Sequence, residues 1–125
     1  MKYFVVTFSI LMSIFSGNSP QKDFDFDKAW AEVNKDIDNR LPKSALEKTE
    51  KIYSEAEKVN NYPQLTKSLV YIGRLTIETN EDGVEKVMQQ YEQKIKTLPE
   101  PVKQILASYL AELYQDYFDS HRWEI

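Results

Sequence analysis

The chain has 125 residues, room for one domain, and 42% of its residues are hydrophobic. Its formal net charge is −4, and this acidic balance argues against nucleic acid or an anionic membrane surface as a partner. It contains no cysteine, which excludes a disulfide framework, a thiolate metal cluster and a lipid-anchored N-terminal cysteine.

The N-terminal 19 residues have the pattern of a secretory signal peptide. Lys2 precedes an apolar run of 13 residues, which is shorter than the roughly 20 residues that span a bilayer. Small residues follow, and we expect cleavage between Ser16 and Pro20. The alternative is a buried N-terminal helix. Removing residues 1–19 takes away Lys2 and no acid, so the net charge of −4 becomes −5. We expect the domain at residues 20–125 to be periplasmic or secreted, without membrane insertion after cleavage.

Beyond residue 20, apolar residues recur at helical spacing, while glycine and proline fall between the periodic segments. The pattern predicts an all-α domain of five helices, with a proline in or beside the first turn of three of them. The expected bounds are Phe26 to Asn39, Pro42 or Lys43 to Val59, Pro63 to Glu78, Gly83 to Lys96, and Pro101 to Ser120. In the turn "TNEDG", Gly83 is expected to be the flexible point.

Broad apolar stripes on the second, fourth and fifth helices are typical of a packed core and not of a membrane surface. The stripes comprise Ala45, Thr49, Ile52, Ala56 and Val59; Val84, Val87, Met88, Tyr91 and Ile95; and Ile105, Leu106, Tyr109, Leu110, Leu113, Tyr114 and Tyr117. Because the helices are short, burial against their neighbours must stabilise them.

A shift of 38 residues aligns the chain with itself. The aligned pairs include Tyr53 with Tyr91, Pro63 with Pro101, Gly73 with Ala111, and Leu75 with Leu113. This period is near that of tetratricopeptide repeats and other helical solenoids. We therefore predict two tandem helix hairpins, residues 43–78 and 82–119, preceded by one helix. Gly73 and Ala111 are expected where two helices approach closely.

The repeat leaves one end of the predicted array without a cap. Helical repeats bury their faces by stacking, and terminal units need capping elements. The first helix, with Trp30 and Val33, is suited to cap one end. At the other end, Trp123 and Ile125 are expected to contact a following unit, which predicts that the chain is a fragment of a larger protein. The alternative is that they fold back and close the fifth helix.

The motif "DFDFDK" places Asp23, Asp25 and Asp27 at alternate positions, like the first ligands of a calcium loop. Such a loop also needs glycine at position 6 and glutamate at position 12. Position 6 is Lys28, and Glu32 at position 12 falls within the expected helix. We favour a solvated segment in which Asp25 or Asp27 caps the first helix.

The sequence predicts no catalytic, metal-binding or cofactor-binding residues, and the chain is not expected to be an enzyme. His121 is the only histidine, so neither a histidine metal cluster nor a cysteine–histidine pair is possible. The three glycines form no phosphate-binding loop.

Tyrosines are unusually frequent for a small core. Tyr71 and Tyr109, at aligned repeat positions, are candidate contacts to a protein partner, because tyrosines on a helical face can line a binding groove. Trp123 and Ile125 are further candidate contacts. The alternative, which we favour for the tyrosines as a group, is packing within and between repeats.

Two stretches, "LPKSALEKTEKIYSEAEKVNNYPQLTKSLVYIGRL" (residues 41–75) and "LASYLAELYQDYFDSHRWEI" (residues 106–125), resemble a known family. They are similar to the N-terminal helical region of bacterial alpha-2-macroglobulin-like proteins, very large protease traps of Gram-negative envelopes. The resemblance covers roughly residues 28–125. It implies an exported helical platform attached to an endopeptidase-inhibitor body that continues beyond Ile125.

None of the family's active parts can be carried over to this sequence, because the thioester of many members derives from a cysteine and this chain has none. The predicted function is therefore a non-catalytic scaffold or interaction segment of such an inhibitor. Its partners would be the rest of the parent chain, proteases or envelope proteins. The rival prediction is a stand-alone tetratricopeptide-like module that binds a peptide or an envelope protein.

Overall fold

The computed structural model describes residues 23–122; the predicted signal peptide, Trp123 and Ile125 lie outside this range. Across the described residues there are five helices and no strand. The helices are α2 (Phe26–Asp38), α3 (Pro42–Lys58), α4 (Tyr62–Thr79), α5 (Gly83–Ile95) and α6 (Val102–His121). The all-α prediction is confirmed, and each helix begins and ends within one residue of its expected bound.

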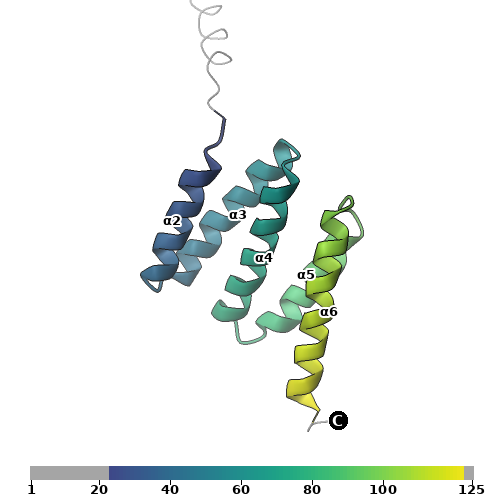
Figure 1. The fold of residues 1–125 in the computed structure, drawn as a ribbon. Coiled ribbons are helices and arrows are strands. Elements are labelled where there is room, and N and C mark those ends of the chain that lie inside the picture. The colour runs from purple at the N-terminus through teal and green to yellow at the C-terminus, as the bar shows by residue number, and fades with distance from the viewer. Residues whose placement is uncertain (1–22, 123–125) are drawn as a thin grey trace, which may run out of the picture.

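The helices form two layers (Figure 1). α2, α4 and α6 lie in the nearer layer, and α3 and α5 lie behind them. Each helix packs against the next one along the chain, and α4 also packs against α6. The hairpins α3–α4 and α5–α6 therefore form as the repeat predicts, and α2 covers α3.

Local sequence sets both ends of α2. The side chain of Asp25 accepts a hydrogen bond from the backbone N–H of Lys28 at 3.0 Å, so Asp25 caps the helix. After the helix, Arg40 adopts the left-handed region with a φ of 60°, and the backbone N–H of Leu41 donates to the Asp36 carbonyl at 2.8 Å. This closing motif reverses the chain and leads into α3.

The end of α3 repeats the same closing motif. Asn60 has a φ of 53°, and the backbone N–H of Asn61 donates to the Ala56 carbonyl at 2.9 Å. The Asn61 side chain then accepts a hydrogen bond from the backbone N–H of Gln64 at 3.3 Å and caps α4. Two successive connections thus have one design.

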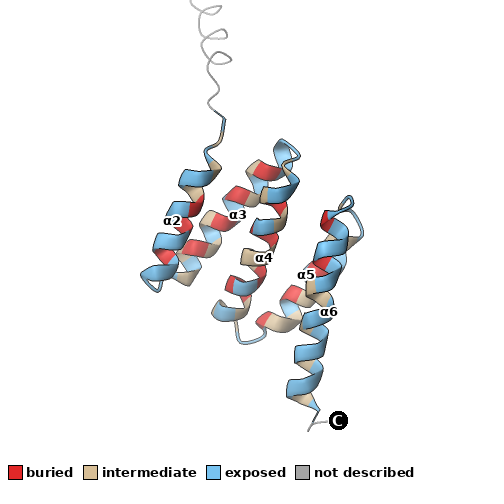
Figure 2. Ribbon diagram, in the orientation of Figure 1, coloured by how far each residue is buried: buried red, intermediate tan, exposed pale blue. Residues whose placement is uncertain are grey.

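The core has two parts, which meet at α3 and α4. The part that includes α2 is built from Trp30, Val33, Ala45, Ile52 and Leu75. The second part is built from Ala56, Leu65, Leu69, Val87, Tyr91, Val102 and Leu106. Figure 2 shows these buried positions on the facing sides of the helices, and the buried residues of α6 are confined to its N-terminal half.

Three residues of the predicted apolar stripes are exposed, and those assignments were wrong. Val59 is 64% exposed because α3 has already ended at Lys58. Ile105 and Tyr114 are 41% and 43% exposed, because α6 is covered by α4 and α5 on part of its circumference only. The rest of the stripes is buried or half-buried.

Gly73 allows α5 to approach α4 closely. The Tyr91 hydroxyl donates to the Leu69 carbonyl at 2.9 Å. A Cβ at residue 73 would overlap this hydroxyl and would lie 3.3 Å from Val87. Burial raises the pKa of Tyr91 to about 12. The expectation of a close approach is correct for Gly73, whereas the aligned residue Ala111 is exposed.

Gly83 has a different role from the flexible point that the sequence predicts. It is buried, and its φ is not positive. A Cβ there would lie 2.5 Å from the Cα of Ile77 and 2.7 Å from the carbonyl oxygen of Thr76. Glycine is needed because the start of α5 packs directly against the backbone at the end of α4.

A polar contact fastens α2 to α3. Asp36 is only 6% exposed, and its Oδ2 accepts a hydrogen bond from the Ser44 hydroxyl at 2.6 Å. The Lys48 ammonium lies 2.9 Å from the same oxygen. The hydrogen bond from Ser44, followed by that from Lys48, holds the pKa of Asp36 below its usual value.

Candidate functional site

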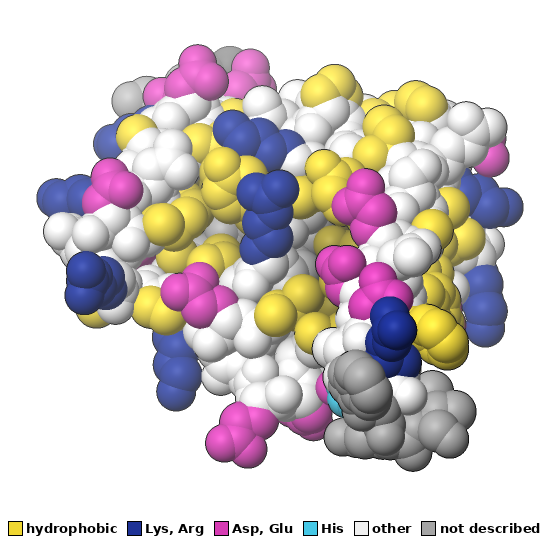
Figure 3. Space-filling model, turned by 60° about the horizontal axis from the view of Figure 1, so that its bottom comes forward, with side chains coloured by type: hydrophobic (Ala, Val, Ile, Leu, Met, Phe, Trp, Pro, Cys, Tyr) yellow, Lys and Arg dark blue, Asp and Glu magenta, His cyan; other side chains and the backbone are white. Residues whose placement is uncertain are grey.

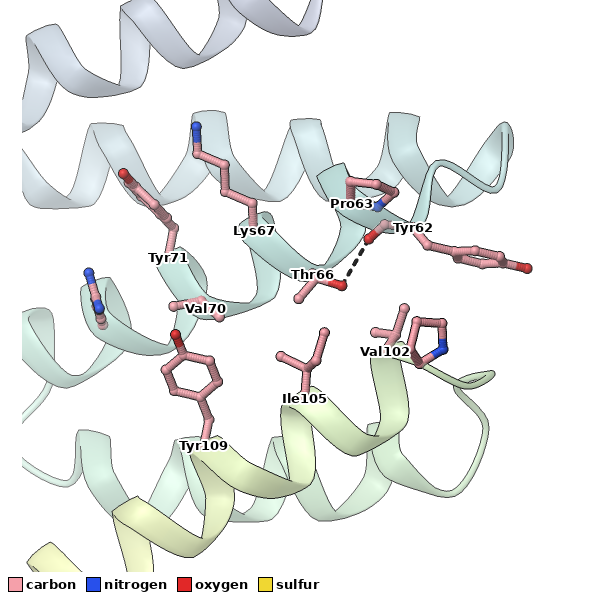
Figure 4. Close-up of a pocket in the computed structure, with 11 residues that line it drawn as sticks. Tyr62, Pro63, Thr66, Lys67, Val70, Tyr71, Val102, Ile105 and Tyr109 are labelled. Atoms are coloured by element: carbon pink, nitrogen blue, oxygen red, sulfur yellow. Dashed lines mark hydrogen bonds between the residues drawn. The ribbon is translucent and has the colours of Figure 1, made fainter.

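A groove of about 550 Å³ lies between α4 and α6 in the nearer layer (Figure 4). Its walls come from the second helix of each predicted hairpin, so it exists only when the two hairpins are side by side. The lining residues are Tyr62, Pro63, Thr66, Lys67, Val70, Tyr71, Arg74, Pro101, Val102, Ile105 and Tyr109.

Helical register directs the two walls toward each other. Thr66 and Val70 are four residues apart and share one side of α4, and Ile105 and Tyr109 share one side of α6 in the same way. Figure 4 shows Ile105 and Tyr109 pointing toward α4. The 41% exposure of Ile105 therefore arises at the groove.

Aromatic contacts to α2 support the α4 wall. The indole N–H of Trp30 donates to Oε1 of Gln64 at 2.6 Å. The Trp30 and Tyr71 rings are tilted against each other, with their centroids 4.7 Å apart. The Lys67 ammonium lies 4.2 Å from the Trp30 ring centroid and 5.7 Å from that of Tyr71, within the range of cation–π attraction. These contacts hold the Lys67 charge at the α2 side of the groove.

The charge of the groove is opposite to that of the chain. The chain has 20 acidic residues, but none of them lines the groove, whereas Lys67 and Arg74 both do. Within residues 23–122, neither cation forms a salt bridge with an acidic side chain. An otherwise apolar groove with two cations at its edge is suited to a ligand with apolar groups and a carboxylate.

The structure brings together two of the four candidate contact residues. Tyr71 lines the groove from α4 and Tyr109 from α6, and both side chains are half-buried. Tyr71 also packs on Trp30, so it contributes to the core as well as to the groove. Trp123 and Ile125 lie outside the described residues.

Sequence reasoning missed the two cations of the groove. Lys67, Tyr71 and Arg74 have the spacing i, i+4 and i+7, which places them on one side of a helix. That spacing was a usable signal. The spacing could not indicate the opposite wall of the groove, because no local pattern shows that α6 packs beside α4.

The other residues considered for chemistry have local roles. Asp25 caps α2, and no group of three or more His, Cys, Asp or Glu residues within the described range is placed to hold a metal ion. Nδ1 of His121 lies 2.8 Å from the Tyr117 carbonyl, and the two rings are stacked with centroids 4.1 Å apart.

In the part of the chain that the structure covers, no helix has the length and apolar character needed to cross a bilayer.

Comparisons with protein-family models, curated proteins and solved structures found no match to this chain. The relationship to alpha-2-macroglobulin-like proteins stays a prediction that rests on the motifs at residues 41–75 and 106–125.

Proposed function

We propose that this chain is a non-catalytic helical interaction module that binds a short acidic and apolar segment of a protein partner between α4 and α6. The observation that carries the proposal is the composition of the groove: apolar walls, two cations at the edge and no acid. Such a groove attracts a carboxylate in an otherwise acidic protein and directs the bound segment toward its apolar walls.

Packing around the groove supports this function. The α4 wall is fixed by the Trp30–Gln64 hydrogen bond and the Trp30–Tyr71 ring contact, and the α6 wall by the buried residues Val102 and Leu106. Walls fixed in this way lose little conformational entropy when a ligand binds. Ile105 and Tyr109 then offer apolar area without a large rearrangement.

The test uses two matched peptides and the isotopically labelled chain. One peptide alternates leucine and glutamate, and its control carries glutamine in place of every glutamate. We expect the acidic peptide to shift the NMR signals of Val70, Ile105 and Tyr109, and to bind more tightly than its control. Equal binding of the two peptides would contradict the role of the cations, and no binding of either would contradict the groove.

Charge reversal tests the cations directly. Arg74→Glu should weaken binding of the acidic peptide by about tenfold, because a favourable charge contact becomes a repulsive one. Lys43→Glu is the matched control, since Lys43 is exposed, lies outside the groove and undergoes the same change of charge. Equal effects of the two substitutions would indicate non-specific attraction.

We also propose that the module belongs to an exported alpha-2-macroglobulin-like inhibitor, in which it would be a helical platform. The motifs at residues 41–75 and 106–125 support this proposal, together with a signal peptide predicted at residues 1–19. It is compatible with peptide binding, because both assign the chain a non-catalytic role. The genomic reading frame after the Ile125 codon tests it. An open frame into strand-rich domains is the expected result, and a natural stop codon at that point would exclude the proposal.

A further inference from the structure

α6 has a second apolar surface outside the groove and the core. It consists of Ala107, Ala111, Tyr114 and Phe118, which follow the spacing i, i+4, i+7 and i+11 along one side of the helix. All four are exposed, Tyr114 by 43% and Phe118 by 59%. Hydrophobic side chains accordingly reach the surface on the α6 side of the molecule in Figure 3. We call these four residues the outer stripe of α6.

The internal repeat assigns each outer-stripe residue a counterpart on α4. With the shift of 38 residues, the counterparts in order are Leu69, Gly73, Thr76 and Asn80. Leu69, Gly73 and Thr76 lie on α4, and Asn80 is its C-cap. These four residues contact α5, so their contacts indicate what kind of element the outer stripe can bind.

Contacts at both ends of α5 fix its direction on α4. Tyr91, late in α5, donates its hydroxyl to the Leu69 carbonyl and covers Gly73. Gly83, at the start of α5, lies against Thr76 and donates its backbone N–H to the Asn80 carbonyl at 3.1 Å. α5 therefore runs antiparallel to α4 along this surface.

We propose that the outer stripe of α6 binds an amphipathic helix of a protein partner, antiparallel to α6, in the position that α5 occupies on α4. Ala107 and Ala111 are small and allow a partner helix to approach. Ala111 carries the Cβ that Gly73 lacks, so the side chain that fits opposite it is an apolar one without the hydroxyl of Tyr91. Tyr114 and Phe118 supply the apolar area at the other end. Because this surface is separate from the α4–α6 groove, the inference does not depend on the proposed function.

One charged residue supports the antiparallel direction. Lys103 is exposed and lies one turn before Ala107, at the end of the outer stripe where an antiparallel helix would finish. A lysine there would attract the carbonyl groups at the C-terminus of that helix. The partner is therefore a helix with apolar residues at the spacing of Val84, Val87 and Tyr91.

The probe is a synthetic peptide of residues 81–98 with Tyr91→Phe, which removes the hydroxyl that a Cβ would overlap. It is constrained as a helix by a staple between Gln89 and Gln93, which are exposed on α5. The constraint is needed because a short isolated helix is marginal in water. Added to the full, isotopically labelled chain, it should shift the NMR signals of Ala107, Ala111 and Phe118. A peptide with Tyr91→Asp should bind about tenfold more weakly, because its apolar side is interrupted.

Substitutions in the chain locate the site. Ala111→Arg should abolish binding of the stapled peptide, whereas Ser108→Arg, an exposed position on another side of α6 with the same change of charge, should not. Arg74→Glu should also leave it unchanged, which separates this site from the groove. Failure to bind, equal binding by the Ala111→Arg chain, or shifts confined to the natural α5 site around Gly73 would overturn the proposal. If the chain forms a dimer and Ala111→Arg abolishes that dimer, the occupant of the outer stripe is a second copy of the chain and the proposal is overturned.

Discussion

The hydroxyl of Tyr91 occupies the space that a side chain at residue 73 would fill, so Gly73 and Tyr91 form one joint between the two hairpins. The Tyr91 ring approaches α4 closely enough for its hydroxyl to reach the Leu69 carbonyl at 2.9 Å. Because the joint combines a missing Cβ at Gly73 with a buried hydrogen bond from Tyr91, a substitution at either residue tests it.

Gly73→Ala should destabilise the domain by about 1–2 kcal/mol. Overpacking a fitted core costs about 1–3 kcal/mol, and an overlap with the buried Tyr91 hydroxyl belongs in the upper part of that range, about 2–3 kcal/mol. The better helix propensity of alanine, worth about 1 kcal/mol, offsets part of that cost. Urea denaturation followed by circular dichroism measures the change. In the double variant with Tyr91→Phe, which removes the overlapping oxygen, part of the loss should be recovered. A Gly73→Ala variant as stable as the original chain would disprove the joint.

Tyr91 should make folding sensitive to alkali. Its pKa is raised from 10.0 to about 12, so the folded state holds this proton more tightly than the unfolded state. The contribution of the protonated Tyr91 to the free energy of unfolding is fully present below pH 10 and is lost as the pH rises from about 10 to 12. Thermal unfolding between pH 9 and 12 should show a smaller loss for Tyr91→Phe. Tyr62→Phe, at a 37% exposed position, is the control and should behave like the original chain.

Asp36 should contribute to acid sensitivity. The Ser44 and Lys48 contacts hold the pKa of Asp36 below the ordinary value of 3.8. The contribution of Asp36 to the free energy of unfolding is therefore present above pH 3.8 and is lost as the pH falls through the lower pKa of the folded state. Asp36→Asn should be less stable at pH 7 and should lose less stability on acidification. Asp38→Asn, an exposed position in the same helix, provides the comparison. If the two variants had the same pH profile, the Asp36 contact would have no such role.

Arg40→Gly should stabilise the connection between α2 and α3. A side chain in the left-handed region costs roughly 1–2 kcal/mol, and glycine avoids that cost at an entropic penalty of about 0.5–1 kcal/mol. The expected gain in unfolding free energy is therefore up to about 1.5 kcal/mol. Asn60→Gly should gain less, because asparagine tolerates this region better, and a larger gain at Asn60 than at Arg40 would contradict the explanation.

Local sequence was sufficient to predict the helices, because their ends are defined by nearby residues. Asp25 and Asn61 act as caps, Pro42 begins α3, and Pro63 lies in the first turn of α4. The repeat also predicted the close approach at Gly73. The caps and prolines depend on short-range geometry, which a single sequence contains, whereas the Gly73 contact lies between two helices and was indicated by the alignment of the repeat.

The sequence indicated Tyr71 and Tyr109 as candidate groove residues, but the rest of the groove and the role of Gly83 could not be predicted in the same way. The groove depends on the lateral distance between α4 and α6, whose facing residues Val70 and Ile105 are far apart in the sequence. Gly83 stands beside "NED", which is typical of a flexible turn, while the reason for the glycine is the backbone of Ile77 opposite it. Contacts between distant segments, and not propensity, determine both features.

The confinement of buried residues to the N-terminal half of α6 has a consequence for local unfolding. Val102 and Leu106 are fully buried, and Leu110 and Leu113 still pack against the core, so only the last turns of α6 can separate from α5 while α2, α3 and α4 stay folded. Amide hydrogen exchange should therefore be faster at Tyr114 and Phe118 than at Leu69. A helix bound to the outer stripe would slow that exchange, so the exchange rates at Tyr114 and Phe118 would measure whether the stripe is occupied.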